Sequence, residues 1–426
     1  MSGNTLISDD LLRQLVGVGQ VDLVVGIPTL NHASTIGDMV KAVQTCFLRH
    51  FPRQRTVLIH SDGGSTDATV AIVRDRGVTD ADTVTTSHGL RTTHRISTPY
   101  RPMPGQGDAS RLVLRAADLL QARVVVMLDP DLSVTPERVA ALARPVGEHE
   151  LDFVTPVYDR PPADGLLVTQ LLRPLFGSLF GRRLHEPSAS EFACSGRFAA
   201  AWGEDSTETA DAAADGGTVW LTAAALSGPF KTGQVVLGRR TAAAGRPQPP
   251  LAAVFPQIVG DALLALAAYA GRWTTAAGEA VLTLGAHRQS AEPDSAGRSA
   301  DDGTSLLASF ADDVRNLEDI LRAVIGPDSL AAIVAAANEP APHYPGPLWA
   351  ATVADFLVAY QRGVMRRDHL VQALLPLYRA RAGSFLCTYG AAPGDAVDTA
   401  LEDLCVDFER IRNQVVERWT TTTQGR

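Results

Sequence analysis

Lysine is almost missing from this 426-residue sequence, in which Lys41 and Lys231 are the two lysines among 38 basic residues. Such dominance of arginine is typical of a GC-rich genome. The 47 acidic residues outnumber the basic ones, and the formal net charge of −9 excludes a uniformly basic protein that binds nucleic acid. A local basic site for a phosphate or diphosphate is compatible with this balance.

Cysteine is scarce as well, and no CxxC pair occurs among Cys46, Cys194, Cys387 and Cys405. Their wide spacing argues against a zinc ribbon and against a disulfide-rich scaffold. The N-terminal segment lacks a basic stretch followed by an apolar core, so no secretory signal is predicted. We therefore expect a cytoplasmic protein.

Long hydrophobic runs are also rare. The longest apolar stretch, Leu251 to Tyr269, is interrupted by Pro256, Gln257 and Asp261. A membrane-spanning helix needs about 20 consecutive, predominantly apolar residues. We expect a buried or half-buried helix here, and no membrane partner.

Apolar runs of strand length alternate with helical patterns over the first 160 residues. Strands are predicted over residues 21–27, 55–60, 123–128 and 152–157, and Pro28 is expected to end the first of them. A helix is predicted over residues 109–120. This alternation predicts an α/β fold with a mostly parallel, doubly wound central sheet and helices on both faces.

The pattern changes after Pro161. Residues 165–183 are predicted to be helical, and the apolar segments 219–226 and 234–237 could extend the sheet or flank a site. Residues 203–217 and 287–304 have loop and linker composition, and helical spacing continues from 305 to 419. We predict an α/β domain over 1–285, a linker-like segment over 286–304 and a helical C-terminal region over 305–426.

The sequence LDPD places Asp129 and Asp131 where a buried strand is predicted to end. Two carboxylates separated by one residue can face a hard cation such as Mg²⁺, which keeps places for phosphate oxygens. In open α/β sheets, ligands bind outside the carboxyl ends of the strands. The alternative is an ordinary turn in which Asp131 or Ser133 helps to start the next helix.

Three other loops follow the same pattern. The segment IPTLN contains Pro28, Thr29 and Asn31, whose amide could contact a base or ribose. In SDGGSTD, Asp62 could accept from a ring N–H or a ribose hydroxyl. In PGQGDAS, Gln106 precedes a helix whose N-terminal dipole favours anions. Each loop taken alone is equally typical of a turn or a helix cap.

Taken in this order, the segments VVGIPTLNH, SDGGSTDAT, GQG and DPD resemble the motifs of nucleotide-sugar glycosyltransferases with the GT-A fold. The chain is most similar to the glucosylglycerate, mannosylglycerate and glucosyl-3-phosphoglycerate synthases of that group. Further similar segments include LLRPLFGSLFG, SEFACSGRF, VWLTAAA and LLPLYRARAGSF. The resemblance implies a GT-A domain over residues 1–285 and retaining transfer of a sugar from a GDP- or UDP-sugar to a small, glycerate-like acceptor.

The sequence departs from this family at several positions. His32 replaces an acidic residue, Gln106 replaces a lysine, and Thr218 stands where an acceptor-side acid is expected. The histidine that serves the family as a second metal ligand is also missing from its segment, in which Arg239, Arg240 and Arg246 lie instead.

The resemblance implies that Asp129 and Asp131 hold Mg²⁺ or Mn²⁺. Guanidinium groups can hold a diphosphate bidentately, so Arg239 and Arg240 could make the metal dispensable. Glu191 is the best remaining carboxylate near the expected acceptor site, and we take Glu191 and Thr218 as candidate catalytic positions. The alternative for Glu191 is an acid at the surface or at the start of a helix.

Two other functions remain possible. A changed acceptor suggests an S-glycosyltransferase of secondary metabolism, which would transfer a GDP-linked sugar to a thiol such as ergothioneine, as in lincosamide assembly. A thiolate is already nucleophilic and needs no strong base. The other alternative is a non-catalytic protein that binds nucleotide sugars. Apolar stripes in the C-terminal helices suggest a homodimer, or equally an intramolecular core.

Overall fold

The computed structural model describes residues 7, 9–75, 93–99, 107–205, 217–243, 250–285 and 300–424. The chain forms two compact units, each assembled from separate stretches. Unit 1 comprises residues 1–157, 188–248 and 282–285, and unit 2 comprises residues 158–187, 249–281 and 286–426.

An eight-stranded sheet forms the centre of unit 1, with the strand order β3-β2-β1-β4-β6-β5-β7-β8. The strands are β1 (Leu23–Thr29), β2 (Thr56–Asp62), β3 (Thr93–Pro99), β4 (Val124–Met127), β5 (Phe153–Asp159), β6 (Phe192–Ser195), β7 (Thr232–Arg239) and β8 (Leu282–Leu284). Parallel pairing joins β3, β2, β1 and β4, whereas β6 is antiparallel to both β4 and β5. The prediction of a mostly parallel sheet is confirmed.

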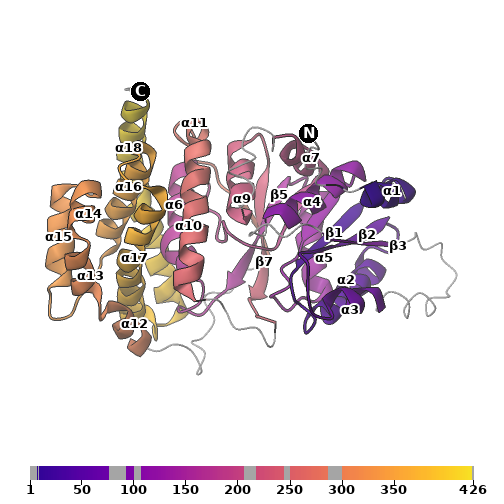
Figure 1. Ribbon diagram of the computed structural model, residues 1–426, viewed down its shortest axis with the longest axis horizontal. Coiled ribbons are helices and arrows are strands. Elements are labelled where there is room, and N and C mark those ends of the chain that lie inside the picture. Colours follow the sequence, from indigo (N-terminus) through magenta and orange to yellow (C-terminus); the bar gives the residue numbers. More distant parts are fainter. Residues whose placement is uncertain are drawn as a thin grey trace. The chain divides into compact units, whose positions relative to one another are not determined.

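Helices cover both faces of this sheet (Figure 1). They are α1 (Asp9–Val18), α2 (Ile36–His50), α3 (Thr69–Asp75), α4 (Gly107–Leu119), α5 (Pro136–Glu148), α7 (Gly196–Asp205) and α9 (Thr218–Ser227). Helices α2 and α5 pack on one face and α4 and α7 on the other. Gly26 of β1 lets α4 approach closely, because a Cβ atom there would lie 2.4 Å from Cγ1 of Val113.

The sheet changes its direction of growth between β1 and β4. From β1 the chain adds β2 and β3 on one side, and it then returns to place β4 on the other side. Leu23 of β1 pairs with Thr56 of β2 and with Val124 of β4, so the carboxyl ends of these three strands lie next to one another. Such a switch point is where open α/β sheets bind ligands.

Two details of the sheet differ from the sequence prediction. Strand β1 continues through Pro28 to Thr29, which pairs with Asp62. Proline is tolerated because β4 pairs with β1 only as far as Gly26, so the missing N–H of Pro28 faces no β4 residue. Residues 219–226 lie inside helix α9 and do not extend the sheet, whereas 234–237 lie in β7.

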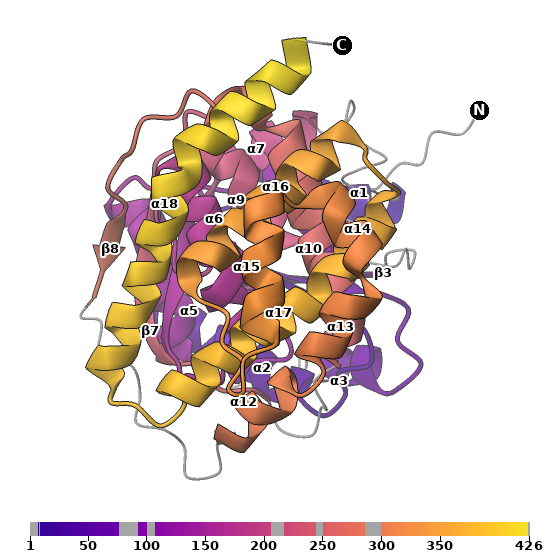
Figure 2. The ribbon, with the colours of Figure 1, turned by 90° about the vertical axis from the view of Figure 1, so that its left-hand side faces the viewer.

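Unit 2 is helical (Figure 2). It contains the π-helix η1 (Val168–Leu172) and the α-helices α6 (Arg173–Phe180), α10 (Leu251–Ala268), α11 (Ala270–Trp273), α12 (Ala300–Leu307), α13 (Phe310–Asn316), α14 (Glu318–Val324), α15 (Pro327–Ala337), α16 (Gly346–Arg362), α17 (Arg367–Tyr389) and α18 (Gly394–Gln424). The long helix α18 runs beside α6 and α16. The predicted helical C-terminal region is therefore confirmed.

Buried polar groups join the C-terminal helices to the segment 158–187. Trp349 Nε1 donates to the carbonyl of Gln170 at 2.7 Å, and Arg381 Nε donates to Oε1 of Gln170 at 3.0 Å. The segment 158–187 therefore folds with the C-terminal helices, although it lies inside the stretch 1–285. The boundaries at 285 and 305 stay a prediction, and residues 286–299 and 206–216 lie outside the described residues.

Helix α10 is the one described helix with the length and apolar composition of a membrane span, and a third of it is buried. One such helix is weak evidence, because the core helix of a globular protein has the same properties. The expectation that no membrane is bound stays a prediction.

The carboxylate of Asp152 joins three parts of unit 1, and it predicts a pH dependence of stability. It accepts from Ser195 Oγ at 2.8 Å, from the backbone N–H of Lys231 at 3.0 Å and from the guanidinium of Arg197. Burial alone raises the pKa of Asp152, but hydrogen bonds from Arg197, Lys231 and Ser195 hold this pKa below its ordinary value.

A lowered pKa means that the folded state favours the ionised carboxylate. The contribution of Asp152 is therefore complete above about pH 4 and is lost as the pH falls through the lower folded-state pKa. We expect Asp152→Asn to lower the free energy of unfolding by about 1–3 kcal/mol at pH 7 and by less at pH 3. Thermal unfolding of both proteins between pH 2.5 and 7 measures this, and an equal destabilisation at all pH values would contradict it.

Candidate functional site

The loop that follows β2 is held by a buried carboxylate. Oδ2 of Asp62 accepts from the backbone N–H groups of Gly64 and Ser65, both at 3.0 Å. Oδ1 accepts from Ser65 Oγ at 2.6 Å and from Thr29 Oγ1 at 3.3 Å. A carboxylate has about four acceptor positions. This geometry favours a role for Asp62 in shaping the loop, and its predicted contact with a nucleotide stays a prediction.

Asn31 links the loops that follow β1 and β2. Its backbone has φ of 57°, a left-handed conformation that asparagine tolerates better than most residues. Its Oδ1 accepts from the N–H of Thr66 at 2.8 Å, and its own N–H donates to Ser65 Oγ at 2.8 Å. The exposed side-chain NH₂ is the part of Asn31 that could still donate to a ligand.

The residues before Asn31 are less accessible. Thr29 is buried, and its Oγ1 lies 2.7 Å from Nε2 of His60 in the neighbouring strand. Pro28 is half-buried at the strand end. Of the three residues predicted in this loop, Asn31 is the one exposed to a ligand, and the predicted roles of Pro28 and Thr29 in binding stay predictions.

The motif DPD follows β4, and its two carboxylates differ in exposure: that of Asp129 is buried and that of Asp131 is exposed. Asp129 is buried, and its oxygens accept from the N–H of Asp131 at 2.9 Å and from the hydroxyl of Ser190. The side chain of Asp131 is 48% exposed, and its Oδ1 lies 3.1 Å from Nε2 of His32. The structure thus brings the loops after β1, β2 and β4 together.

The end of β7 lies beside this motif. The N–H of Ala243 donates to the carbonyl of Asp131 at 2.8 Å, and the N–H of Ser133 donates to the carbonyl of Thr241 at 2.9 Å. Arg239, at the end of β7, is exposed, and Arg240 is half-buried. The segment that carries Arg239 and Arg240 therefore runs next to Asp131. Arg246 and Gln106 lie outside the described residues.

Glu191 is enclosed in unit 1 and has an ionic partner. Its Oε1 accepts from Nε of Arg138 at 3.0 Å and from Nη2 of the same residue at 2.5 Å. The side chain of Glu191 is 0% exposed, and that of Arg138 is 8% exposed. A carboxylate with no exposed surface is not available to an acceptor in this geometry, which favours a structural role for Glu191 over the predicted catalytic one.

Thr218 begins helix α9. Its hydroxyl donates to the carbonyl of Ser188 at 3.0 Å. This bond joins the start of α9 to the segment that contains Ser190 and Glu191. The contact gives Thr218 a part in shaping the wall of the site, and its predicted catalytic role stays a prediction.

The residues at this strand end fit a cation that keeps several water or phosphate ligands. Mg²⁺ and Mn²⁺ prefer oxygen, and Mg²⁺ is commonly bound through one or two carboxylates plus substrate phosphates. Asp131 has an exposed carboxylate, with Asp129 behind it. Among the described residues, no group of three His, Cys, Asp or Glu side chains is arranged to hold a metal ion. The fit is therefore to a metal bound together with a diphosphate.

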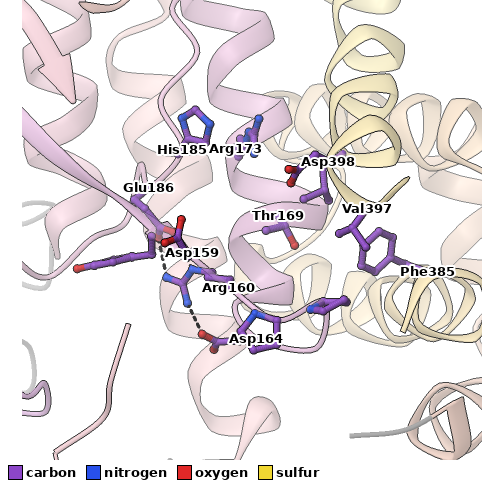
Figure 3. Close-up of a pocket in the computed structure, with 14 residues that line it drawn as sticks. Asp159, Arg160, Asp164, Thr169, Arg173, His185, Glu186, Phe385, Val397 and Asp398 are labelled. Carbon is purple, nitrogen blue, oxygen red and sulfur yellow. Dashed lines mark hydrogen bonds and ion pairs between the residues drawn. The ribbon is translucent and has the colours of Figure 1, made fainter. Parts of the chain in front are cut away.

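A second polar site is a pocket within unit 2, between the chain after β5, η1 and α17–α18 (Figure 3). Arg160 bridges two carboxylates there, with Nε 2.8 Å from Glu186 and Nη1 2.9 Å from Asp164. Burial alone lowers the pKa of Arg160, but Glu186 and Asp164 hold it above its ordinary value. The charge of Arg160 is thus neutralised inside the pocket wall.

Two other groups in this pocket are buried donors. Thr169 Oγ1 and Arg173 Nε have no hydrogen-bond partner in the described part of the chain. Nη2 of Arg173 lies 3.7 Å from Glu402, and His185 lines the same pocket. Unmatched buried donors favour a ligand that carries acceptor oxygens, such as a small carboxylate or phosphate. The sequence did not indicate this pocket, because its residues come from segments that have no shared motif.

Residues 24–201 match the family Glycosyl transferase family 2. This segment spans less than half of the chain, but it contains β1 to β6 and the loops that carry Asn31, Asp62, Asp129 and Asp131. The segment is similar to a glycosyl transferase family 2 domain, which bears out the glycosyltransferase class predicted from the motifs.

Among solved structures, the chain is similar to glucosyl-3-phosphoglycerate synthase from Mycobacterium tuberculosis. The complex with phosphoglyceric acid is 20% identical, with a TM-score of 0.43 and coverage of 64% of this chain and 86% of that chain. The complex with Mn²⁺, UDP and phosphoglyceric acid is 19% identical, with a TM-score of 0.41 and coverage of 63% and 84%.

A third structure of that enzyme, with Mn²⁺, UDP-glucose and phosphoglyceric acid, is 22% identical, with a TM-score of 0.41 and coverage of 59% of this chain and 80% of that chain. At this identity and TM-score, the ligands bound in those structures are not assigned to this chain. No curated protein sequence matches the chain.

Proposed function

We propose that the protein is a retaining glycosyltransferase that moves a sugar from a GDP- or UDP-sugar to a small polar acceptor. The observation that carries this proposal is the meeting of three polar loops at the switch point between β1 and β4. Asn31, Asp131 and the loop held by Asp62 all lie at the carboxyl ends of adjacent parallel strands. Open α/β sheets in general bind ligands at such a switch point.

The transfer needs the charge on the departing diphosphate to be neutralised. Asp131, with Asp129 behind it, would hold a Mg²⁺ or Mn²⁺ ion whose chemistry is to act as a Lewis acid on the phosphate oxygens. Arg239 and Arg240 lie on the segment that pairs with Asp131 through its backbone. Their guanidinium groups would supply part of the same neutralisation, which makes partial independence from metal a consequence of the proposal.

The acceptor would be a small polar molecule. A glycerate-like compound is the first candidate, because the motifs resemble those of synthases that use such acceptors. A thiol such as ergothioneine, in an S-glycosyl transfer, is the second candidate. Glu191 is buried, and position 218 is a threonine without a carboxylate, so neither residue offers an exposed base to the acceptor. A thiolate acceptor needs no strong base, which supports this candidate.

Binding of nucleotides tests the donor site first. We expect UDP or GDP to bind the full-length protein more tightly than ADP in calorimetric titrations, with affinity that falls but does not vanish when EDTA replaces Mg²⁺. Transfer to glycerate, phosphoglycerate and a panel of thiols then identifies the acceptor. Failure of all three nucleotides to bind, with and without metal, would refute the proposal.

Binding of one nucleotide without transfer to any acceptor would favour the non-catalytic alternative. We further propose that the protein works in the cytoplasm as a homodimer, without nucleic-acid or membrane partners. The acidic net charge argues against a nucleic-acid partner, and the free, widely spaced cysteines suit a reducing compartment. Sedimentation of the purified protein measures the oligomeric state.

A further inference from the structure

His32 lies between two of the loops that form the donor site. It follows β1, and its ring reaches the carboxylate of Asp131, 99 residues further along the chain and beyond β4. The His32 side chain is 7% exposed, whereas that of Asp131 is 48% exposed. The contact therefore joins a fixed, buried ring to a carboxylate that faces outward.

The hydrogen bonds of the ring determine its tautomer. The backbone N–H of Leu30 donates to Nδ1 at 3.0 Å, so Nδ1 carries a lone pair and the ring hydrogen is on Nε2. Nε2 is thus the donor, and Oδ1 of Asp131 is the acceptor, at 3.1 Å. The imidazole cannot offer Nε2 as a metal ligand while it makes this bond.

The backbone around His32 prevents the ring from shifting. Its N–H donates to Thr69 Oγ1 at 2.8 Å, and its carbonyl accepts from Thr35 and Ile36 at 3.0 and 2.9 Å. Asp67 accepts from Thr69 and from the N–H of Ala33 at 3.0 Å. The first turn of α2 and the loop before α3 therefore hold His32 in place.

We propose that His32 is a positioning residue that orients Asp131 toward the cation of the donor complex. A hydrogen bond to Oδ1 from a fixed ring favours one rotamer of an exposed aspartate and so fixes the direction in which its carboxylate faces. Partners that orient metal-binding carboxylates in this way change metal affinity by about 10–100-fold when they are removed. This inference rests on the proposed function, because it assigns a role within the same donor site.

The test compares His32→Leu, which removes both ring nitrogens, with His32→Gln, whose amide NH₂ can reach the place of Nε2. Free Mn²⁺ is measured by electron paramagnetic resonance in the presence of saturating UDP or GDP. We expect His32→Leu to raise the Kd of Mn²⁺ by about 10–100-fold, and His32→Gln to raise it by no more than about threefold. His50→Gln is the matched control, because His50 lies at the end of α2 and contacts Arg144.

Two further measurements separate positioning from damage to the fold. The affinity for nucleotide in EDTA should be unchanged in all three variants, and His32→Leu should have no further effect on Mn²⁺ binding in an Asp131→Ala background. Unchanged Mn²⁺ affinity in His32→Leu would overturn the inference, as would an equal loss of metal-free nucleotide binding. If the unmodified protein bound nucleotide but no Mn²⁺, the inference would fail alone, whereas the absence of nucleotide binding would refute the proposed function.

Discussion

Replacement of Asp131 by alanine is expected to weaken the joint binding of nucleotide and divalent cation by about 100-fold, because it removes the exposed carboxylate of the DPD motif. Its side chain is 48% exposed, so the loss of stability should be limited to the hydrogen bond from the buried ring of His32, about 1 kcal/mol. Asp129→Ala should weaken binding to a similar degree and should also lower the unfolding temperature. The buried carboxylate of Asp129 accepts from the Asp131 N–H and from Ser190, so its loss releases both donors.

Calorimetric titration with nucleotide and Mn²⁺ measures the binding, and thermal unfolding measures the stability. Asp38→Ala is the matched control, since Asp38 is exposed on α2 in the same unit. Asp131→Ala with the affinity of this control would show that Asp131 holds no cation. In that case, retained binding in EDTA would assign the diphosphate to the segment of Arg239 and Arg240, and their replacement by glutamine would become the decisive experiment.

The strands that the sequence predicted correctly are those that are buried on both faces. Residues 57–59 and 124–128 are continuous apolar runs, because a parallel strand in the middle of the sheet contacts helices on both sides. Strand β3 (Thr93–Pro99) is polar and forms the edge of the sheet, and β6 (Phe192–Ser195) has four residues. Neither contains an apolar run long enough to be distinguished from a loop.

An apolar run also misled the prediction in one place. Residues 219–226 were expected either to extend the sheet or to flank the site, but they add no strand and form most of helix α9, in which seven residues are buried. A segment that is apolar on all sides shows neither the period of a helix nor that of a strand. Its type is then decided by what surrounds it, which the local sequence does not contain.

The candidate site could be located from the sequence, but the partners of its side chains could not. The motifs indicated which loops lie at the ends of β1, β2 and β4. The bond between His32 and Asp131 joins residues 99 positions apart, and the bond between Arg138 and Glu191 joins residues 53 apart. Such pairs depend on the packing of whole elements, and neither partner carries a local pattern that names the other.

A large loss of stability is expected when one partner of the buried ion pair of Arg138 and Glu191 is replaced. This pair links the first turn of α5 to the start of β6. Glu191→Gln leaves the Arg138 guanidinium buried without a full counter-charge, and Arg138→Leu leaves a buried carboxylate. Removal of one partner of a buried pair costs about 3–5 kcal/mol of stability, whereas replacement of both by apolar side chains is often neutral. We therefore expect either single substitution to be strongly destabilising and Arg138→Met with Glu191→Leu to restore most of the stability.

The stability of unit 1 is measured by unfolding in urea, with and without the nucleotide that binds best. A ligand stabilises the part of the protein to which it binds, so the transition that nucleotide shifts reports on unit 1. Arg115→Met is the control. It removes a more exposed ion pair with Asp118 in α4, and such pairs contribute at most about 1 kcal/mol.

The same variants distinguish the structural role of Glu191 from the catalytic role that the sequence suggested. A structural carboxylate predicts that Glu191→Gln loses stability, and that the apolar double variant regains both stability and nucleotide affinity. A catalytic carboxylate predicts the reverse: Glu191→Gln would unfold at the same urea concentration and bind nucleotide normally, yet would not transfer sugar. Since Glu191 has no exposed surface and accepts two hydrogen bonds from one guanidinium, we expect the first outcome.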